Sequence, residues 1–191
     1  MGEVLFIREY GGLGYGVDYD NWESLKQVTC AFTGHRPQKF PFKFNEEAEG
    51  ALDIKKRLRE EIEQAIMDDY IIFLSGAALG VDTWAALEVL NFRERYYPFI
   101  RLELVLPCIG QESNWNKQAK ETYAYLLDNA DAVTRTSREP YFEGCMKMRN
   151  ELLVRRSNRL IAVWNNKPSG TGQTVGMAHK QGLDIRLIEY I

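Results

Sequence analysis

The sequence predicts an α/β protein built on a Rossmann-like, doubly wound and mostly parallel sheet that is flanked by helices. After residue 27, short apolar runs alternate with longer segments of mixed composition. Such alternation is typical of right-handed strand–helix–strand crossovers. Three of the apolar runs are also followed directly by glycines and by hydroxyl or charged side chains. In an open parallel sheet, the residues that follow the strands line the crevice where ligands bind.

Six apolar segments are the expected strands, at residues 28–33, 70–75, 101–107, 132–136, 160–165 and 184–190. The segments between them are long enough for helices, which we expect at 46–69, 81–92, 116–129, 144–156 and 172–181. The first helix has an acid-rich face opposite an apolar face, as a surface helix does. The apolar face consists of Leu58, Ile62, Ala65 and Ile66. The second helix is apolar on most sides, which suits burial against the sheet.

The first 27 residues do not share this pattern, so we divide the chain into an N-terminal extension (1–27) and a Rossmann-like domain (28–191). Gly12, Gly14 and Gly16 lack the spacing of the dinucleotide-binding motif G-x-G-x-x-G, and no long helix follows them. This favours a turn or a flexible arm over a ligand-binding role. Asp20 and Glu23 have the spacing of a capping box for one helical turn.

Composition excludes several classes of protein. The 191 residues are 45% hydrophobic and 27% charged, as in an ordinary globular domain, and the net charge of −3 gives no general attraction to nucleic acid or anionic membrane. No apolar run approaches the roughly 18 residues that span a bilayer. Cys30, Cys108 and Cys145 are widely spaced, and with only two histidines they indicate neither a disulfide framework nor a metal site. We therefore expect a reduced, metal-free, cytoplasmic protein.

The first of the three loops reads Thr33-Gly34-His35-Arg36. Gly34 permits a tight turn and close approach of a ligand. Arg36 offers a planar fork of donors suited to phosphate, and Thr33 adds a hydroxyl. The alternative is a plain strand-to-helix turn in which Arg36 pairs with a surface acid and His35 is a hydrogen-bonded structural residue.

The second loop, at residues 75–82, joins a strand to the start of a helix. Its small residues expose backbone N–H groups at the positive end of that helix, which is a favourable place for an anion. The residues concerned are Ser75, Gly76, Ala77 and Gly80. Asp82 could bind a ribose hydroxyl, or could simply stabilise the helix terminus.

The third loop, PSGTGQTV at 168–175, repeats this arrangement with Gly170, Thr171 and Gly172. It is not a Walker loop, because the lysine after the second glycine is missing. The alternative to a phosphate contact is a serine- and threonine-rich helix cap. Arg149 and Asn150 lie on the helix expected beside this site, within a locally basic stretch. That stretch fits an anionic ligand, although a solvated helix face explains most such clusters.

Together, the five motifs TGHRP, SGAALGVDTWAA, PCIGQESNW, CM..RN and the final GT loop resemble the YpsA-like family of the SLOG superfamily. That superfamily also contains DNA-processing protein A and the Lonely Guy enzymes, and the family's bacterial and phage members are inferred to be nucleotide sensors. The resemblance covers residues 28–191 and implies a Rossmann-like sheet whose strand-end loops bind a nucleotide or nucleotide-derived ligand. Carried over by position, the implied lining is Gly34, Arg36, Ser75, Gly76, Gly80, Asp82, Arg149, Asn150, Gly170 and Thr171.

The sequence argues against one enzymatic activity of this superfamily. Lonely Guy enzymes use a glutamate shortly after their glycine loop, whereas here the loop continues Gln173-Thr174-Val175-Gly176 without a carboxylate. We therefore expect a binding protein for a small phosphate-bearing ligand, such as a nucleotide or an ADP-ribose-like molecule, with no certain cofactor and no membrane partner.

Two alternatives remain open at this point. One is a nucleotide-processing hydrolase of the N-glycosidase or phosphoribohydrolase type, for which Asp82 and Glu112 are the candidate catalytic residues. The other is a single-stranded DNA binder, against which the acidic composition argues. The apolar helix faces also leave a homodimer open.

Overall fold

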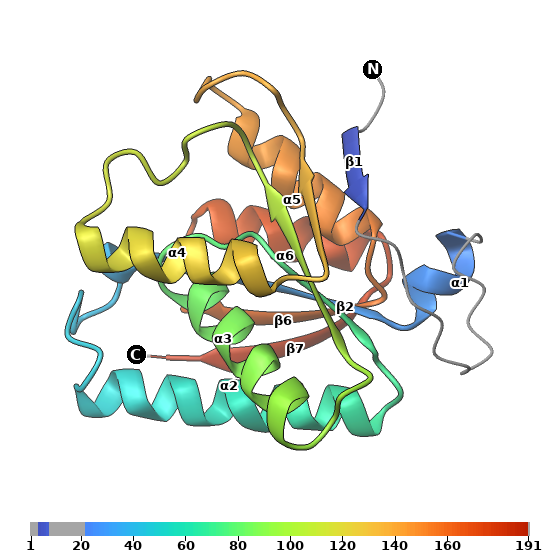
Figure 1. The fold of residues 1–191 in the computed structure, drawn as a ribbon. Coiled ribbons are helices and arrows are strands. Elements are labelled where there is room, and N and C mark those ends of the chain that lie inside the picture. Colours follow the sequence, from blue (N-terminus) through green and yellow to red (C-terminus); the bar gives the residue numbers. More distant parts are fainter. Residues whose placement is uncertain (1–3, 8–21, 191) are drawn as a thin grey trace.

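The computed structural model describes residues 4–7 and 22–190 (Figure 1). Seven strands form one sheet in the order β1-β5-β4-β3-β2-β6-β7. The strands are β1 (Val4–Ile7), β2 (Thr29–Gly34), β3 (Ile72–Ser75), β4 (Arg101–Leu106), β5 (Ala132–Arg135), β6 (Arg159–Trp164) and β7 (Asp184–Glu189). The helices are α1 (Trp22–Gln27), α2 (Glu49–Met67), α3 (Val81–Arg95), α4 (Lys117–Asn129), α5 (Cys145–Arg155) and α6 (Gly170–Lys180), with a 3-10 turn η1 (Pro37–Lys39).

Among the described strands, β2 to β7 run parallel, and β1 alone is antiparallel, to its neighbour β5. The chain moves from β2 through β3 and β4 to β5, then returns to place β6 and β7 on the other side of β2. This topology confirms the predicted Rossmann-like, doubly wound sheet. The direction of winding reverses between β2 and β6, and open α/β sheets bind their ligands at such a reversal.

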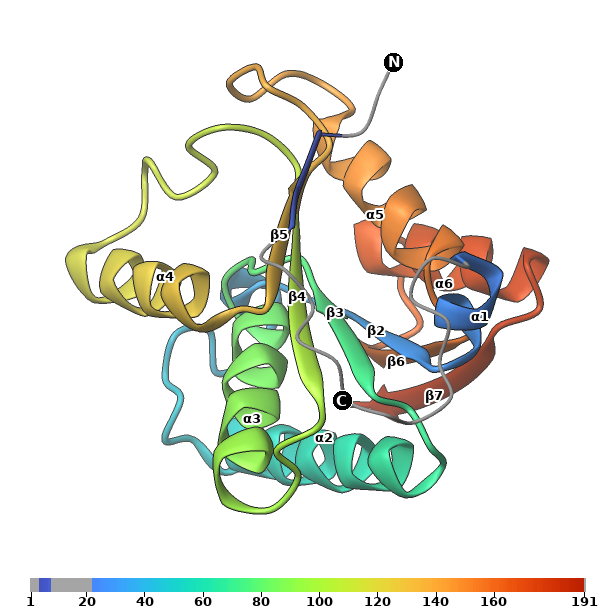
Figure 2. The same ribbon diagram turned by 45° about the vertical axis from the view of Figure 1, so that its right-hand side comes forward.

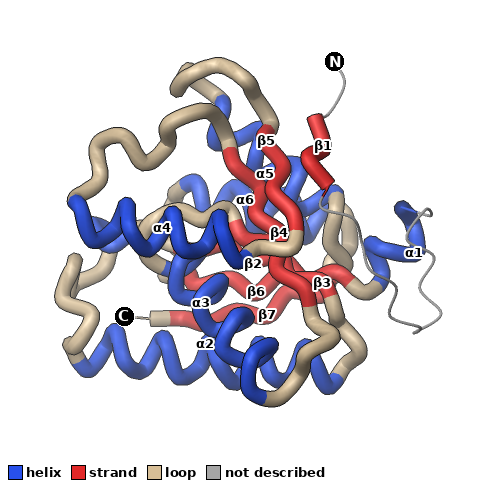
Figure 3. Tube along the Cα trace, in the orientation of Figure 1, coloured by secondary structure: helices blue, strands red, loops and turns tan. Residues whose placement is uncertain are grey.

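Helices cover both faces of the sheet, and Figures 2 and 3 show α2, α3 and α4 on one side and α5 and α6 on the other. Strand residues that point to opposite faces enter separate hydrophobic clusters. Phe32 and Phe73 pack with α2, α3 and α4, whereas Ala31 and Leu74 pack with α5 and α6. The predicted apolar face of α2 is buried throughout, as the helical period requires. No helix in the described ranges is both long and apolar enough to cross a membrane.

Two features differ from the sequence prediction. The extension contributes a strand, β1, that pairs with β5 from Val4–Arg135 to Ile7–Ala132, whereas the six strands expected from the sequence all follow residue 27. Gly12, Gly14, Gly16 and Asp20 lie outside the described residues.

Helix α6 begins at Gly170 rather than at residue 172, because the side chain of Ser169 caps it. Gly170 and Thr171 therefore belong to the first helical turn instead of the loop that the sequence predicts before residue 172.

Candidate functional site

The three predicted loops touch one another at the carboxyl ends of β3, β2 and β6, which are neighbours in the sheet. Nε2 of His35, just after β2, lies 3.1 Å from the hydroxyl oxygen of Ser169, just before α6. A side chain at Gly80 would come within 2.8 Å of the carbonyl oxygen of His35. Three motifs that are far apart in the sequence therefore form one continuous surface, at the place where the winding of the sheet reverses.

His35 is the central residue of the first loop and is buried. Its Nδ1 lies 2.5 Å from the hydroxyl of Tyr190, and its Nε2 faces Ser169. The rings of Phe40 and Tyr190 meet the imidazole edge-on. Burial first, and then the positive charge of Lys39, lower the pKa of His35, so the ring is neutral near pH 7. His35 thus connects the end of β7 to the start of α6.

The neighbours of His35 are held differently. Thr33 is buried at the end of β2, and a side chain at Gly34 would overlap Val81, the first residue of α3. The visible role of Gly34 is therefore close packing of α3 against β2. Arg36 is exposed, and its Nη2 lies 3.7 Å from the sulfur of Met146 in the first turn of α5. Among the described residues the guanidinium of Arg36 makes only this weak hydrogen bond, which leaves it available to an anion.

The second loop is shaped by the hydroxyl of Ser75. That hydroxyl accepts a hydrogen bond from the N–H of Ala77 at 3.0 Å and donates one to the carbonyl of Asp82 at 2.8 Å. Ala77 and Gly80 have positive φ angles of 48° and 89°. At position 80 glycine is required twice, by this φ angle and by the proximity of His35. The conformation of the loop is therefore set by contacts within the protein.

A buried ion pair lies against this loop. Nη1 of Arg149 is 2.8 Å from Oδ2 of Asp82, and both side chains are 8% exposed. The guanidinium occupies the space that a side chain at Gly76 would need. Gln111 covers the same loop, because its Nε2 donates to the carbonyl of Gly76 at 3.3 Å. Gly76 thus makes room for Arg149, and the carboxylate of Asp82 is paired with that guanidinium.

Two buried polar atoms beside this loop have no hydrogen-bond partner among the described residues. They are Nε of Arg149 and Oε1 of Gln111. Unpartnered polar atoms are costly in a protein interior, and they often mark places where water or a ligand binds. Sequence reasoning missed Gln111, although it lies within the motif PCIGQESNW, because its contact depends on tertiary structure.

The third loop ends in a capped helix. The hydroxyl of Ser169 accepts a hydrogen bond from the N–H of Gly172 at 3.1 Å. Gly172 packs against the indole of Trp164, whereas the space around Gly170 is open. The described structure gives no protein acceptor for the N–H groups of Gly170 and Thr171. This turn therefore presents free donors at the positive end of a helix.

A model of the YspA SLOG family matches residues 30–189, a range that contains every motif described above. The chain belongs to this family. A UPF0398 protein of Shouchella clausii is 31% identical over 140 residues, which cover 73% of this chain and 74% of the relative. Another UPF0398 protein, of Halalkalibacterium halodurans, is 31% identical over 171 residues, which cover 86% and 88%.

Two solved structures share the fold of this SLOG chain. DNA processing protein A of Streptococcus pneumoniae matches with a TM-score of 0.62 at 19% identity, over 87% of this chain and 52% of that one. DNA processing protein A of Helicobacter pylori, described in terms of its single-stranded DNA binding mode, matches with a TM-score of 0.60 at 16% identity, over 91% and 70%. Identities this low establish a common fold and no shared ligand.

The remaining predicted site residues lie at the edge of the SLOG site. Asn150 is half-buried beside Arg149, and the described structure gives it no hydrogen bond to the three loops. Glu112 is half-buried in the loop after β4, where its carbonyl accepts a hydrogen bond from Trp115. Trp115, which follows in the same loop, packs edge-on against Tyr123 at the margin of the core, with ring centroids 5.4 Å apart. Among the described residues, no three His, Cys, Asp or Glu side chains are placed to hold a metal ion.

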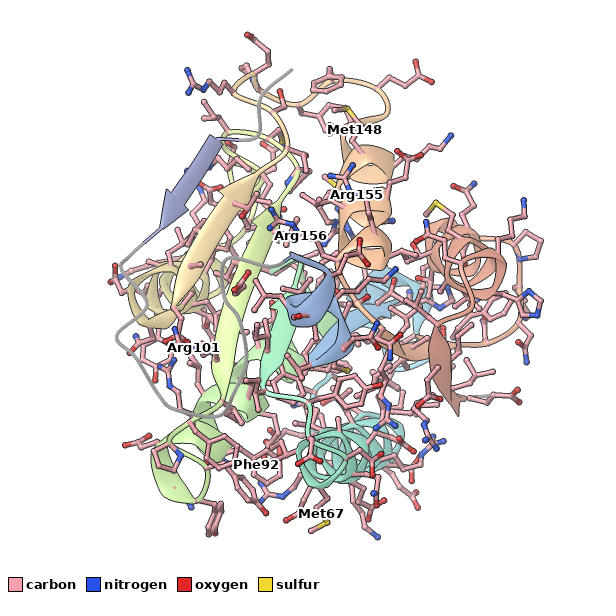
Figure 4. The ribbon with its side chains drawn as sticks, turned by 90° about the vertical axis from the view of Figure 1, so that its right-hand side faces the viewer. Met67, Phe92, Arg101, Met148, Arg155 and Arg156 are labelled. Carbon is pink, nitrogen blue, oxygen red and sulfur yellow. The ribbon has the colours of Figure 1, made fainter. Side chains whose placement is uncertain are left out.

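The loops after β4 and β5 overhang the site. Both project from the same edge of the sheet (Figure 2), and the N–H of Ile109 donates to the carbonyl of Glu139 at 3.0 Å. Helix α5 follows the second of these loops. Figure 4 shows Met148 toward the loop end of α5, with Arg155 toward the other end. The first turns of α5 therefore place Arg149 beside the second loop.

Proposed function

We propose that this SLOG chain binds a nucleotide or nucleotide-derived ligand, of the ADP-ribose type, and acts as a sensor of that ligand. The observation that carries the proposal is the contact among the loops after β2, β3 and β6. These loops meet where the winding reverses, which is the usual ligand site of a doubly wound sheet. Family membership supports a nucleotide-related role.

The phosphate subsite of this proposal lies at the start of α6. The free N–H groups of Gly170 and Thr171 point the positive end of a helix dipole toward an anion. Open space around Gly170 gives a phosphate access to these donors. Arg36, one residue after His35 and exposed, supplies the positive charge.

The sugar and base would then lie toward the second loop and α5. Because Asp82 is already paired with Arg149, it does not bind a ribose hydroxyl directly in this arrangement. The unpartnered Nε of Arg149 and Oε1 of Gln111 are the donor and the acceptor that a polar ligand edge would satisfy.

A thermal-shift panel of AMP, NAD and ADP-ribose tests the proposal. A ligand at about 100 times its Kd adds roughly 2.7 kcal/mol to stability, which for a domain of this size raises Tm by about 5–10 °C. Arg36→Glu should abolish the shift without lowering the Tm of the free protein. Arg95→Glu, the same charge reversal at the exposed far end of α3, should leave the shift unchanged. Equal shifts in both variants would remove Arg36 from the site.

Single-stranded DNA is the second candidate ligand, because the Helicobacter pylori relative in fold binds it. A short oligonucleotide in the same panel separates the two. Binding through many phosphates weakens steeply with salt through counterion release. Binding through loop N–H groups and one arginine should persist at high salt. A shift with DNA alone, lost between about 50 and 200 mM salt, would favour the second candidate.

A further inference from the structure

His35 connects two hydroxyl groups in a continuous chain of hydrogen bonds. Ser169 lies 3.1 Å from Nε2, and Tyr190 lies 2.5 Å from Nδ1. The three residues come from the start of α6, the end of β2 and the end of β7. A hydroxyl within reach of an imidazole that a third group orients is the recurring signature of an activated nucleophile. Nucleotide binding as proposed above uses the N–H groups of Gly170 and Thr171 but assigns no chemistry to the side chains of Ser169, His35 and Tyr190.

The positions of the protons on Ser169, His35 and Tyr190 follow from the chemistry of these side chains. Burial raises the pKa of Tyr190, so this residue remains a neutral phenol. When Nδ1–H of His35 donates to the oxygen of Tyr190, Nε2 carries a lone pair and accepts from the hydroxyl of Ser169. The carbonyl of Lys167, at 3.2 Å, is a second acceptor for the same hydroxyl proton. The neutral state of His35 is the one a general base needs.

The position of Ser169 suits a nucleophile. It is only partly buried, whereas its partner His35 is buried, so a substrate can reach the hydroxyl while the base stays shielded. The two residues that follow, Gly170 and Thr171, have N–H groups without a protein acceptor among the described residues. Donors of this kind, directly after a serine at a helix start, stabilise the oxyanion of a tetrahedral intermediate. The open space at Gly170 admits a substrate carbonyl.

We propose that Ser169 is the nucleophile of a carboxylic-ester hydrolase site, with His35 as its general base and Tyr190 as a positioning residue. The oxygen of Ser169 forms a bond to the ester carbonyl carbon while its proton passes to Nε2 of His35. The negative charge that develops on the carbonyl oxygen is bound by the N–H groups of Gly170 and Thr171. The carbon–oxygen bond to the leaving alcohol then breaks, and Nε2–H protonates that alcohol oxygen.

Water completes the cycle. Its oxygen attacks the carbonyl carbon of the acylated Ser169 while one of its protons passes to Nε2 of His35. The bond between that carbon and the serine oxygen then breaks, the carboxylic acid leaves, and Nε2 returns the proton to the serine oxygen. The net reaction is ester plus water to acid plus alcohol, without a change of oxidation state. This activity stands on the contacts of Ser169, His35 and Tyr190 and does not rest on nucleotide binding.

A fluorophosphonate probe, with p-nitrophenyl acetate as substrate, tests the proposal on the full chain. The wild-type protein should be labelled on the peptide that contains Ser169 and should release nitrophenol. Ser169→Asn keeps a helix-capping side chain but has no nucleophile, so it should fold normally and lose both labelling and turnover. Thr122→Ala, on the distant helix α4, is the matched control and should keep both.

Variants of the other two residues separate catalysis from structure. His35→Gln should slow labelling by about 100-fold or more, as loss of a general base does. Tyr190→Phe should slow it less and should change the pH profile, because the orienting hydroxyl is gone. Lys39→Gln removes a charge that lowers the pKa of His35. The pKa of the base then rises, so activity should begin to fall at a higher pH as the solution is acidified.

Two results would overturn the proposal: an unlabelled, inactive wild-type protein, or a Ser169→Asn protein labelled as fast as the wild type. The nucleotide thermal shift, measured on the same samples, reports on the binding function separately. A protein that shifts with a nucleotide but is not labelled retains the binding function and loses the hydrolase assignment.

Discussion

Two buried arginines, one at each end of the sheet, are held in different ways. Arg159, at the amino end of β6, lies 2.7 Å from Asp68 and 2.6 Å from Asp184. Its guanidinium also stacks over the ring of Tyr70, 4.4 Å from the ring centroid. Arg149, near the carboxyl ends of the strands, pairs with Asp82, and its Nε has no partner among the described residues.

The partners differ as much as the arginines do. The two carboxylates beside Arg159 are 34% and 39% exposed, whereas the carboxylate of Asp82 is 8% exposed. A carboxylate that water can reach tolerates the loss of its cation, and a buried one does not. Arg159, at the amino ends of the strands, therefore has more contacts, but the structure around Arg149, at their carboxyl ends, depends more on a single ion pair. We therefore expect the burial of the partner, rather than the number of partners, to set the cost of losing a cation.

The largest expected loss of stability follows from Arg149→Met. Removal of one member of a buried ion pair leaves an uncompensated charge and costs about 3–5 kcal/mol. For a domain of this size, we expect Tm to fall by roughly 10 °C or more in thermal denaturation. The double variant Arg149→Met with Asp82→Asn should recover much of that loss, because it leaves no unpaired charge. A double variant no more stable than the single one would show that packing against Gly76, not charge, explains the effect.

The second expected loss follows from Arg159→Met. We expect a fall in Tm about half as large as that of Arg149→Met, because water can solvate the two exposed carboxylates that remain. The nucleotide shift should be unchanged, since this cluster lies at the edge of the sheet opposite the three loops. Urea denaturation of both variants makes the comparison. A larger loss for Arg159→Met would reverse the rule drawn from partner burial.

The sequence predicts the sheet and the meeting of its loops, but it does not predict the contacts that distinguish the two ends of the sheet. Alternation of apolar runs gave the parallel sheet, because side-chain periodicity reflects burial directly. The sheet in turn brings the loops after β2, β3 and β6 together. By contrast, the role of Gly76 depends on Arg149 in a helix that follows much later in the chain. The contact of His35 with Tyr190 joins residues 155 positions apart, and no local pattern encodes it.

The sequence also left the boundary of α6 and strand β1 unpredicted. The sequence predicts a helix that begins only at residue 172, with Gly170 in the preceding loop, and glycine is unfavourable inside a helix. The cap by Ser169 and the packing of Gly172 on Trp164 outweigh that preference. Strand β1 is four residues long and pairs at the edge of the sheet, where a distant partner rather than its own sequence decides its conformation.

A smaller effect on Tm is expected when Asp68, beside Arg159, is titrated. A hydrogen bond from Arg159 is the largest of the causes that lower the pKa of Asp68 below its ordinary value of 3.8. A carboxylate with a lowered pKa in the folded state contributes stability above its unfolded pKa and loses it as the pH falls through the folded value. Thermal denaturation between about pH 2 and pH 6 should therefore show a steeper loss of Tm below pH 4 in the wild type than in Asp68→Asn. Parallel curves would remove Asp68 from the acid response.

The smallest effect on stability, and the sharpest test of the open carboxyl end, is expected from Gly170→Val. Nothing lies near the side-chain position at Gly170, so the folded state has room for valine. The free energy of unfolding should therefore change by no more than about 0.5 kcal/mol, as for an ordinary surface substitution. Gly172→Val is the matched control, because its side chain would come within 2.8 Å of the Trp164 indole and should lower Tm clearly.

The valine at 170 would nevertheless occupy the space through which a phosphate or an ester carbonyl approaches the helix N–H groups. Nucleotide affinity, measured by calorimetry, should fall at least tenfold, about 1.4 kcal/mol. Unchanged affinity in a stable Gly170→Val protein would place the ligand away from the start of α6, and would leave the amino and carboxyl ends of the sheet distinguished by their ion pairs alone.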